Sequence, residues 1–276
     1  SSFKNLCDIL GSVLSELPIL IVCRDDFKGI KVHSMNDQQI AFIKLRYACP
    51  VQSKEEEVRC CLSIKDFNLM LKEIPNTSVM HLVQYRHTNK KGEINDDDEL
   101  TILVDDERAA KKQYQCKTLQ MLEDNYTSLE DIESENVIEF NLSTFKGDVK
   151  LSKNAKAMSL DFTLYKSIRT DDSRTLISVA WKGDYLSSNT MHMSQNKTAS
   201  SIDNHDVDMD AWTKHYERSF DTEMINSFLK NMDRESKIIV CLTEEMMIMD
   251  YNLGVENSHI RFHLAPKVED DDEEEA

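Results

Sequence analysis

The sequence repeats a pattern of helix and strand signals in its two halves. The stretch "SSFKNL" at 1–6 resembles "STFKGD" at 143–148, an offset of 142 residues. Further along, "LMLKEIPNTSVMHLV" resembles "SFLKNMDRESKIIVCL", and Leu71 and Lys72 align with Leu229 and Lys230 at an offset of 158. Such a repeat indicates that one supersecondary unit has been duplicated. The larger second offset predicts an insertion in the second half, which we place in the polar stretch 196–215 because long surface insertions cost little loop entropy.

Each half combines helix signals with runs that are typical of strands. Six apolar residues of 3–17 fall on one arc at about 100° per residue, which predicts an amphipathic helix. They are Leu6, Ile9, Leu10, Val13, Leu14 and Leu17. A second helix is predicted at "SIKDFNLMLKEIP", with Ser63 as N-cap and Pro75 as stop signal. The runs "ILIVC", "GIKVHSM" and "IAFIKLRY", and the two that flank the polar loop "TNKKGEINDDD", are strand-like.

We therefore expect an α+β fold of two similar domains, each with two helices on one side of an antiparallel sheet. The predicted boundaries are an N-terminal domain at 1–118, a connecting loop at 119–136, a C-terminal domain at 137–268 and an acidic, disordered tail at 269–276. The connecting loop is acidic and fits neither the helix nor the strand period. The tail has seven acids in eight positions, which is typical of a solvated charge run.

Composition excludes several classes of function. The net charge is -17, and removal of the seven tail acids would leave -10, so bulk attraction to nucleic acid or anionic lipid is not expected. No apolar run reaches the roughly 20 residues of a membrane span, and the first residues lack the features of a signal peptide. We expect a soluble protein. The seven cysteines are odd in number and show no C-x-x-C spacing, which favours a reducing compartment over a disulfide framework or a zinc site.

Motifs for catalysis are not apparent. The six glycines form no phosphate-binding loop, and no nucleophile, histidine and acid stand in a recognisable arrangement, although such triads are spatial. The stretch "NHDVDMD" contains His205, Asp206, Asp208 and Asp210, but it lacks the glycine turn and closing glutamate of a calcium loop. We interpret it as a solvated loop, and we expect a protein that is not an enzyme and that holds no cofactor or metal.

Several stretches together carry a resemblance to a known family. "GIKVHSMNDQQIAFIKLRY" at 29–47, the acidic connecting loop, "MSQ" at 193–195 and "FHLAPKVEDDDEEE" at 262–275 resemble the eukaryotic DNA sliding clamp, the proliferating cell nuclear antigen (PCNA) family. The resemblance spans nearly the whole chain in the same order. It implies a homotrimeric ring that encircles double-stranded DNA without sequence preference. It also implies a processivity factor that tethers DNA polymerase, the clamp loader and other replication and repair proteins.

In this family an apolar pocket on one ring face binds short peptide motifs that carry a glutamine and aromatic side chains. The pocket residues implied by the resemblance are Met35, Ile40, Phe42, Leu129 or Ile132, Met246, Met247, His263, Ala265, Pro266, Lys267 and Val268. Gln39, His263 and the Met246–Met247 pair differ from the residues usual in the family, which predicts a changed pocket. A cluster of Met246, Met247 and Met249 is equally typical of core packing.

Lysines lie opposite the predicted apolar helix faces. These are Lys4, Lys65, Lys72 and Lys230, with Lys146, Lys150 and Lys153 at i, i+4, i+7 spacing in the second half. Helices that bury one face on a sheet present the other to solvent, and in a ring these lysines would contact phosphates. The resemblance also predicts that residues 111–117 pair with residues 190–195 of the next subunit.

The alternative to a clamp is an acidic chaperone or scaffold for basic proteins, which the tail suggests. Lysines on exposed helix faces are also common in proteins that bind no DNA. The resemblance implies location in the nucleus, or in a cytoplasmic replication compartment if the source is a virus.

Overall fold

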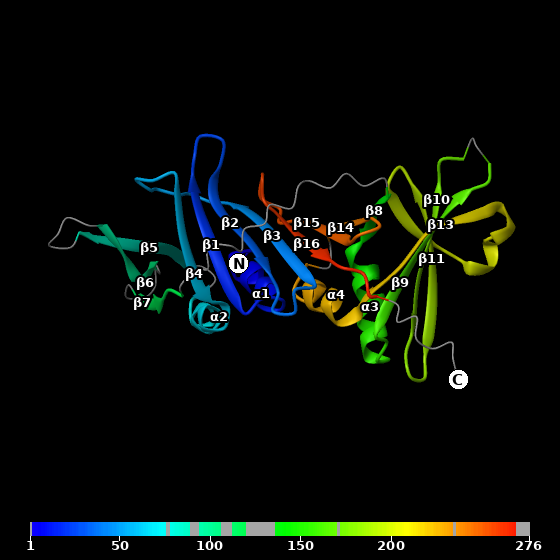
Figure 1. Cartoon of the computed structure of the whole chain (residues 1–276), viewed down its shortest axis with the longest axis horizontal. Coiled ribbons are helices and arrows are strands. Elements are labelled where there is room, and N and C mark those ends of the chain that lie inside the picture. The colour runs from blue at the N-terminus through cyan, green and yellow to red at the C-terminus, as the bar shows by residue number, and fades with distance from the viewer. Residues whose placement is uncertain are drawn as a thin grey trace. The chain divides into compact units, whose positions relative to one another are not determined.

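The computed structural model describes residues 2–75, 78–88, 94–105, 112–119, 136–169, 172–233 and 236–268. These residues form two compact units (Figure 1). The first contains the described parts of Ser1–Gln39, Ile43–Ser128 and Leu253–His259. The second contains those of Ile40–Phe42, Leu129–Asn252 and Ile260–Ala276. The predicted connecting loop, except for its two ends, and the acidic tail lie outside the described residues.

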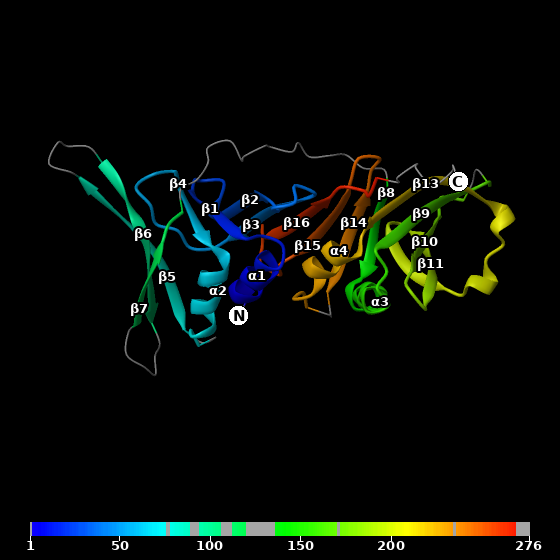
Figure 2. The ribbon, with the colours of Figure 1, turned by 60° about the horizontal axis from the view of Figure 1, so that its bottom comes forward.

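The first unit has two sheets and a pair of helices. Its elements are α1 (Ser2–Gly11), β1 (Glu16–Cys23), β2 (Lys28–Met35), β3 (Ala41–Ala48), β4 (Glu57–Ser63), α2 (Ile64–Lys72), β5 (Val79–Thr88), β6 (Ile94–Asp105) and β7 (Lys112–Lys117). The strand orders are β3-β2-β1-β4 and β5-β6-β7. Helices α1 and α2 pack side by side on one face of the four-stranded arrangement (Figure 2). Beyond its pairing with β6, β7 has no strand partner among the described residues.

The second unit repeats this plan with additions. Its elements are β8 (Asn136–Asn141), α3 (Leu142–Asn154), β9 (Ser159–Ser167), β10 (Thr175–Lys182), β11 (Ser187–Gln195), β12 (Thr198–Ile202), two 3₁₀ turns (Asn204–Asp206 and Met209–Ala211), β13 (Trp212–Asp221), α4 (Thr222–Leu229), β14 (Lys237–Leu242), β15 (Met247–Asn252) and β16 (His259–Leu264). The strand order is β13-β9-β10-β11-β12-β8-β14-β15-β16. Helices α3 and α4 form its helix pair. The predicted α+β class is confirmed.

One interaction recurs in both units and confirms the duplication. The Lys4 ammonium on α1 donates to the carbonyl of Ile74, just after α2. The Lys146 ammonium on α3 donates to the carbonyls of Lys230 and Met232, just after α4, at 2.7 and 3.0 Å. Lys4 and Lys146 differ by 142 residues, and Ile74 and Met232 by 158, which are the two offsets of the sequence repeat. In each unit a lysine of the first helix therefore binds carbonyls of the segment that directly follows the second helix.

The helix starts follow local chemistry. Ser63 is the N-cap of α2, as predicted, and its hydroxyl accepts from the Asp66 amide at 3.4 Å. Asp221, 158 residues later, caps α4 by accepting from the Met224 amide at 2.9 Å. A side-chain oxygen at the N-cap satisfies one of the free amides of the first turn. The equivalent positions in the two units thus use different residue types for the same bond.

One sequence-based expectation needs correction. The helix predicted over 3–17 ends at Gly11, because residues from Glu16 onward pair with β4, with Leu17 opposite Leu62. The polar stretch 196–215 contains β12, which pairs antiparallel with residues 191–195 of β11 through a turn at Asn196 and Lys197. Both turn residues have positive φ, 50° and 71°, as a two-residue hairpin turn of type I′ requires. Residues 191–195, predicted to meet the next subunit, are therefore already paired within the chain.

The second unit has a core of stacked aromatic rings. Phe145 on α3 stacks on Phe140 of β8 at 5.1 Å between centroids and also contacts Phe162 of β9. Phe3, the residue that matches Phe145 in the repeat, packs against Phe67 of α2 in the first unit.

All seven cysteines are free, and burial raises the pKa of Cys60 to about 12 and that of Cys61 to about 11. Within the described residues, no helix is long and apolar enough to cross a membrane.

The recurring lysine bonds predict a stability effect. Replacement of Lys4 or Lys146 by Met removes the donor to the carbonyls that follow α2 or α4, and should lower the free energy of unfolding by about 1 kcal/mol. Lys150→Met is the matched control on α3, since Lys150 is exposed, and should change it by less than about 0.5 kcal/mol. Urea unfolding followed by circular dichroism tests this. Equal stability of all three variants would show that the bonds contribute nothing.

Candidate functional site

Five of the seven predicted DNA-facing lysines lie on exposed parts of the helix pairs. On α2 the buried side chains Ile64, Phe67 and Leu71 face the sheet, while Lys65 and Lys72 are exposed. In the second unit the exposed lysines are Lys150 and Lys153 on α3 and Lys230 at the C-cap of α4. Periodicity thus placed these five side chains on the solvent side of their helices, as expected.

Lys4 and Lys146 differ from the other five. Both are half-buried, and their ammonium groups are bound to the carbonyls that follow α2 and α4. A lysine held in this way cannot reach a phosphate without giving up these bonds. The two residues therefore stabilise the helix pairs, and the prediction that they contact phosphates stays a prediction that would require these bonds to be broken. Helical periodicity indicates only the direction of a side chain, and the carbonyl acceptors come from a different helix.

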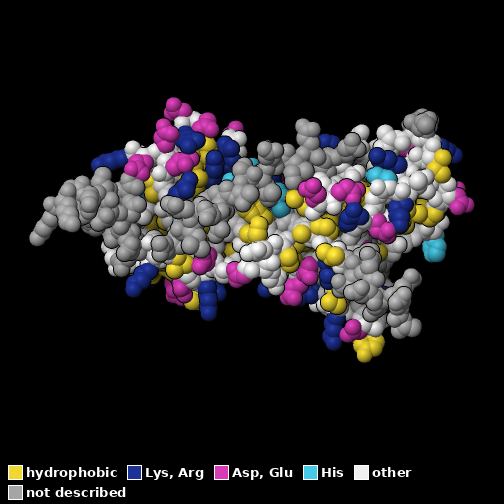
Figure 3. All heavy atoms as spheres, viewed as in Figure 1, with side chains coloured by type: hydrophobic (Ala, Val, Ile, Leu, Met, Phe, Trp, Pro, Cys, Tyr) yellow, Lys and Arg dark blue, Asp and Glu magenta, His cyan; other side chains and the backbone are white. Residues whose placement is uncertain are grey.

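Acidic side chains are interspersed with these lysines. Asp66 and Glu73 accompany Lys65 and Lys72, and Lys153 pairs with Glu223 of α4 at 3.3 Å. Both members of this pair are exposed, so its contribution to stability is small. On the face of the molecule shown in Figure 3, Lys and Arg side chains are likewise mixed with Asp and Glu. Among the described residues, the lysines of the helix faces are therefore interspersed with acids.

In the second unit, residues 263–265 contact residues 40–42. The Ala265 amide donates to the Ile40 carbonyl at 3.0 Å, and the rings of Phe42 and His263 lie 5.8 Å apart, edge to face. The Lys267 amide donates to the Ser219 carbonyl of β13 at 2.8 Å. These contacts bring together four of the predicted pocket residues and attach the last described segment to the sheet.

The exposure of the predicted pocket residues separates surface from core. Ile40 and Val268 are 38% and 88% exposed, Ala265 is exposed, and Pro266 and Lys267 are half-buried. We refer to these five residues, Ile40, Ala265, Pro266, Lys267 and Val268, as the C-terminal patch. Phe42, His263 and Met247 are buried and support the patch or fill the core, as Met249 does.

The other predicted pocket residues belong to other elements or lie outside the described residues. Met246 is half-buried on the β14–β15 turn, where its amide and carbonyl bind Thr243. Met35 is 47% exposed at the end of β2 in the first unit. Leu129 and Ile132 lie outside the described residues.

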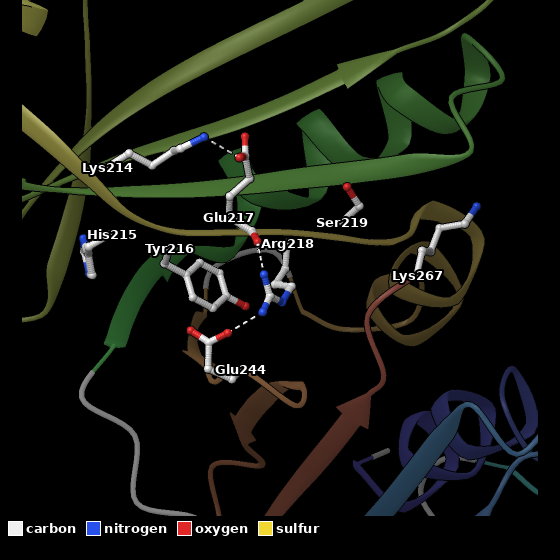
Figure 4. A pocket seen from close by; sticks show the side chains of 8 residues that line it. All are labelled: Lys214, His215, Tyr216, Glu217, Arg218, Ser219, Glu244 and Lys267. Carbon is white, nitrogen blue, oxygen red and sulfur yellow. Dashed lines mark hydrogen bonds and ion pairs between the residues drawn. The ribbon is translucent and has the colours of Figure 1, made fainter. Parts of the chain in front are cut away.

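A charged pocket of about 490 Å³ lies beside the C-terminal patch in the second unit (Figure 4). Its lining comes from β13, the β14–β15 turn and the last segment, and consists of Lys214, His215, Tyr216, Glu217, Arg218, Ser219, Glu244 and Lys267. Lys214 pairs with Glu217 at 2.6 Å, and Arg218 pairs with Glu244. Sequence reasoning missed this pocket. The alternating charges of "KHYERS" were the available signal, but the partners on the turn and the last segment are distant in sequence.

The acidic loop at 203–210 uses its carboxylates locally. Asp203 and Asp208 accept from the amides of His205 and Asp210 at 3.0 and 3.3 Å, as the N-caps of the two 3₁₀ turns. In the parts of the chain that the structure describes, no three or more His, Cys, Asp or Glu side chains are grouped so that they could hold a metal ion.

Comparison with known proteins identifies the fold. Neither models of protein families nor curated proteins give a significant match to the sequence. Among solved structures, the chain is similar to one in the complex of PCNA2 and PCNA3 from Sulfolobus tokodaii, with a TM-score of 0.66. The similarity covers 97% of this chain and 96% of that chain at 15% sequence identity. The chain has the DNA clamp fold. The predicted resemblance to PCNA is therefore confirmed at the level of fold.

The clamp fold accounts for the arrangement of the candidate surfaces. Each unit buries one face of its helix pair against a sheet and leaves Lys65 and Lys72, or Lys150, Lys153 and Lys230, on the other. The C-terminal patch and the charged pocket belong to the second unit, and both depend on the attachment of Lys267 to β13.

The burial of the patch residues predicts different responses to truncation. Phe42→Ala removes a ring that is 5% exposed and should cost about 3 to 5 kcal/mol of unfolding free energy. Ile40→Ala, two residues away and 38% exposed, should cost less than about 1 kcal/mol. Thermal unfolding of both variants measures the difference. If Phe42→Ala were as stable as Ile40→Ala, Phe42 would belong to the surface of the patch and not to its support.

Proposed function

We propose that the protein is a DNA sliding clamp, a processivity factor that encircles duplex DNA and tethers DNA polymerase and other replication and repair proteins. The observation that carries this proposal is the clamp fold, which extends over 97% of the chain with two duplicated units. The exposed lysines on the helix pairs and the apolar C-terminal patch support it. Function in the nucleus, or in a viral replication compartment, and the absence of catalytic activity belong to the same proposal.

In this proposal DNA is held by phosphate contacts from Lys65, Lys72, Lys150, Lys153 and Lys230. Such contacts are independent of sequence and weaken as salt rises, because bound counterions are released from the DNA. The net charge of -17 is compatible with this role, since charges more than about 8 Å away are largely screened at physiological salt. The protein would therefore retain DNA by enclosure, with a weak and salt-sensitive attraction.

Partners would dock on the C-terminal patch through short apolar motifs. Ile40, Ala265 and Val268 supply exposed apolar surface, and Lys267 supplies a polar anchor at its edge. An exposed apolar patch with polar groups at its border is the usual form of such a peptide site. Polymerases, a clamp loader and other proteins with clamp-binding motifs are the partners that fit.

Assembly into a homotrimeric ring is part of the proposal, and the edges of the sheets limit how it occurs. Strand β7 is open on one side among the described residues and can accept another strand. On β11, β12 covers residues 191–195, and the Asn204 side chain donates to the Asn189 carbonyl at 2.8 Å. Pairing of β7 with β11 of another subunit would therefore require displacement of β12. The similar solved structure is titled as a complex of two different PCNA proteins, so assembly with a related second chain is the other form of this proposal.

The state of β12 makes assembly testable. Sedimentation at micromolar concentration should give a mass near three times 31.9 kDa. Thr198→Pro with Ser200→Pro removes amide donors from β12 and should lower the concentration at which trimers form by severalfold, because the competing strand is weakened. A wild-type chain and a variant that both remain monomeric at tens of micromolar would contradict homotrimer formation. Addition of a related chain would then test the heteromeric form.

The helix faces are tested by charge reversal. Lys72→Glu with Lys150→Glu should shorten retention on circular duplex DNA. The slope of log affinity against log salt concentration should also become shallower, because about two fewer counterions are released from the DNA. Lys166→Glu with Lys182→Glu is the matched control, because both residues are exposed on β9 and β10 and the change in net charge is the same. If both double variants were retained equally, the helix faces would not be the DNA surface.

A further inference from the structure

The charged pocket adjoins the C-terminal patch through one residue. Lys267 belongs to both, and its amide bond to the Ser219 carbonyl holds the last segment against β13. Lys267 lies two positions after Ala265, which is about 7 Å along an extended chain. A peptide seated on the patch would therefore place a side chain at the pocket within about two residues of its apolar anchor.

The pocket is positive in a chain that is otherwise strongly acidic. Its lining contains three cations, Lys214, Arg218 and Lys267, and two carboxylates, Glu217 and Glu244. The lining therefore carries a net charge of +1 with His215 neutral, whereas the whole chain carries -17. An anionic group is thus better matched to this pocket than a cation.

Two of the cations are held by exchangeable pairs. The side chains of Lys214 and Glu217 are each 54% exposed, and the hydrogen bond from Lys214 to Glu217 raises the pKa of Lys214. Arg218 donates to Glu244 and, at 2.8 Å, to the Glu217 carbonyl, with its side chain 42% exposed. Exposed pairs of this kind contribute little stability, so an incoming carboxylate can replace an internal one at small cost.

The third cation has a neutral acceptor. The Lys267 ammonium donates to the Met158 carbonyl at 3.3 Å, and in the described residues no carboxylate lies within ion-pair distance of it. This ammonium supplies the surplus charge of the pocket. It also lies on the segment that the patch and the pocket share.

The inner wall of the pocket is neutral and fixed. Tyr216 is 4% exposed, and its hydroxyl donates to the Thr243 carbonyl at 3.1 Å. Burial raises the pKa of Tyr216, so the hydroxyl stays protonated over the physiological range. Figure 4 shows this ring between the chain of β13 and Glu244. The cations of the pocket are therefore accompanied by a buried, neutral Tyr216 side chain whose hydroxyl is held by a hydrogen bond.

We propose that the charged pocket binds the carboxylate of an acidic residue that flanks the apolar anchor of a partner peptide on the C-terminal patch. The inference rests on the proposed function and adds a partner chemistry to it. Arg218 and Lys267 are the residues that would receive the carboxylate, the first by exchange with Glu244 and the second directly. The chain's own acids at 269–276 are the other source of carboxylates.

The test compares two synthetic peptides by calorimetry at low salt. Both carry one glutamine and two aromatic residues of the clamp-binding type, and they differ only in two flanking positions, Glu in one and Gln in the other. The Glu peptide should bind about three to ten times more tightly, and the ratio should fall at higher salt. Arg218→Met should bring the ratio close to one and leave affinity for the Gln peptide unchanged. Glu244→Gln, which removes the competing carboxylate, should increase the ratio.

Matched variants separate the possible failures. Arg174→Met is the control, since Arg174 is an exposed arginine paired with Asp172 outside the pocket, and it should keep the wild-type ratio. A ratio of one in the full chain would overturn the proposal. If that ratio rose to three or more after truncation at Val268, the tail would be the occupant, and the assignment to a partner would be wrong.

The proposed function fails in a different way. If neither peptide bound, or if Ile40→Asp left both affinities unchanged, the C-terminal patch would not be the partner site, and the inference would fall with it. Binding of the Gln peptide that depends on Ile40, without any gain from Glu, would overturn the inference alone.

Discussion

The packing of helix pairs on sheets, secured by a lysine at the end of each pair, is the constraint on which both units depend. The chain that follows each second helix exposes backbone carbonyls, and the first helix of each pair supplies a donor to them through Lys4 or Lys146. This bond holds the second helix in place against its neighbour. The outer faces of the pairs, with their exposed lysines, are therefore presented on elements whose relative positions are set by buried contacts.

The sequence predicted the features that depend on local chemistry. The cap at Ser63, the apolar face of α2 and the strands β1 to β3 follow from residue type and spacing. The paired lysine bonds were not predicted, although they recur at the two offsets of the sequence repeat. The predicted C-terminal end of α1 was wrong. Leu17 fits the helical period, but it pairs with Leu62 of β4, and this tertiary pairing outweighs the local helical pattern. The same holds for β12, whose polar residues gave no strand signal and whose pairing with β11 depends on a turn of two residues with positive φ.

The candidate site was predictable only in part, for a related reason. Family resemblance pointed to Ile40, Phe42 and the last segment, and the structure joins these through bonds between residues more than 200 positions apart. Resemblance cannot separate exposed from buried members, and Phe42 and Met247 are buried. The charged pocket escaped prediction because Arg218 and Glu244 become partners only when the β14–β15 turn lies beside β13.

The two surfaces share an electrostatic limit that follows from the composition. In a chain of net charge -17, the long-range field repels both DNA and acidic peptides, and attraction exists only within roughly a Debye length of particular cations. On the helix pairs the cations are separate lysines among acids, and in the pocket the surplus is a single charge. Neither surface could therefore capture its proposed ligand from a distance. A clamp with such surfaces would depend on enclosure to hold DNA and on apolar contact to hold partners, with the local cations acting after contact is made.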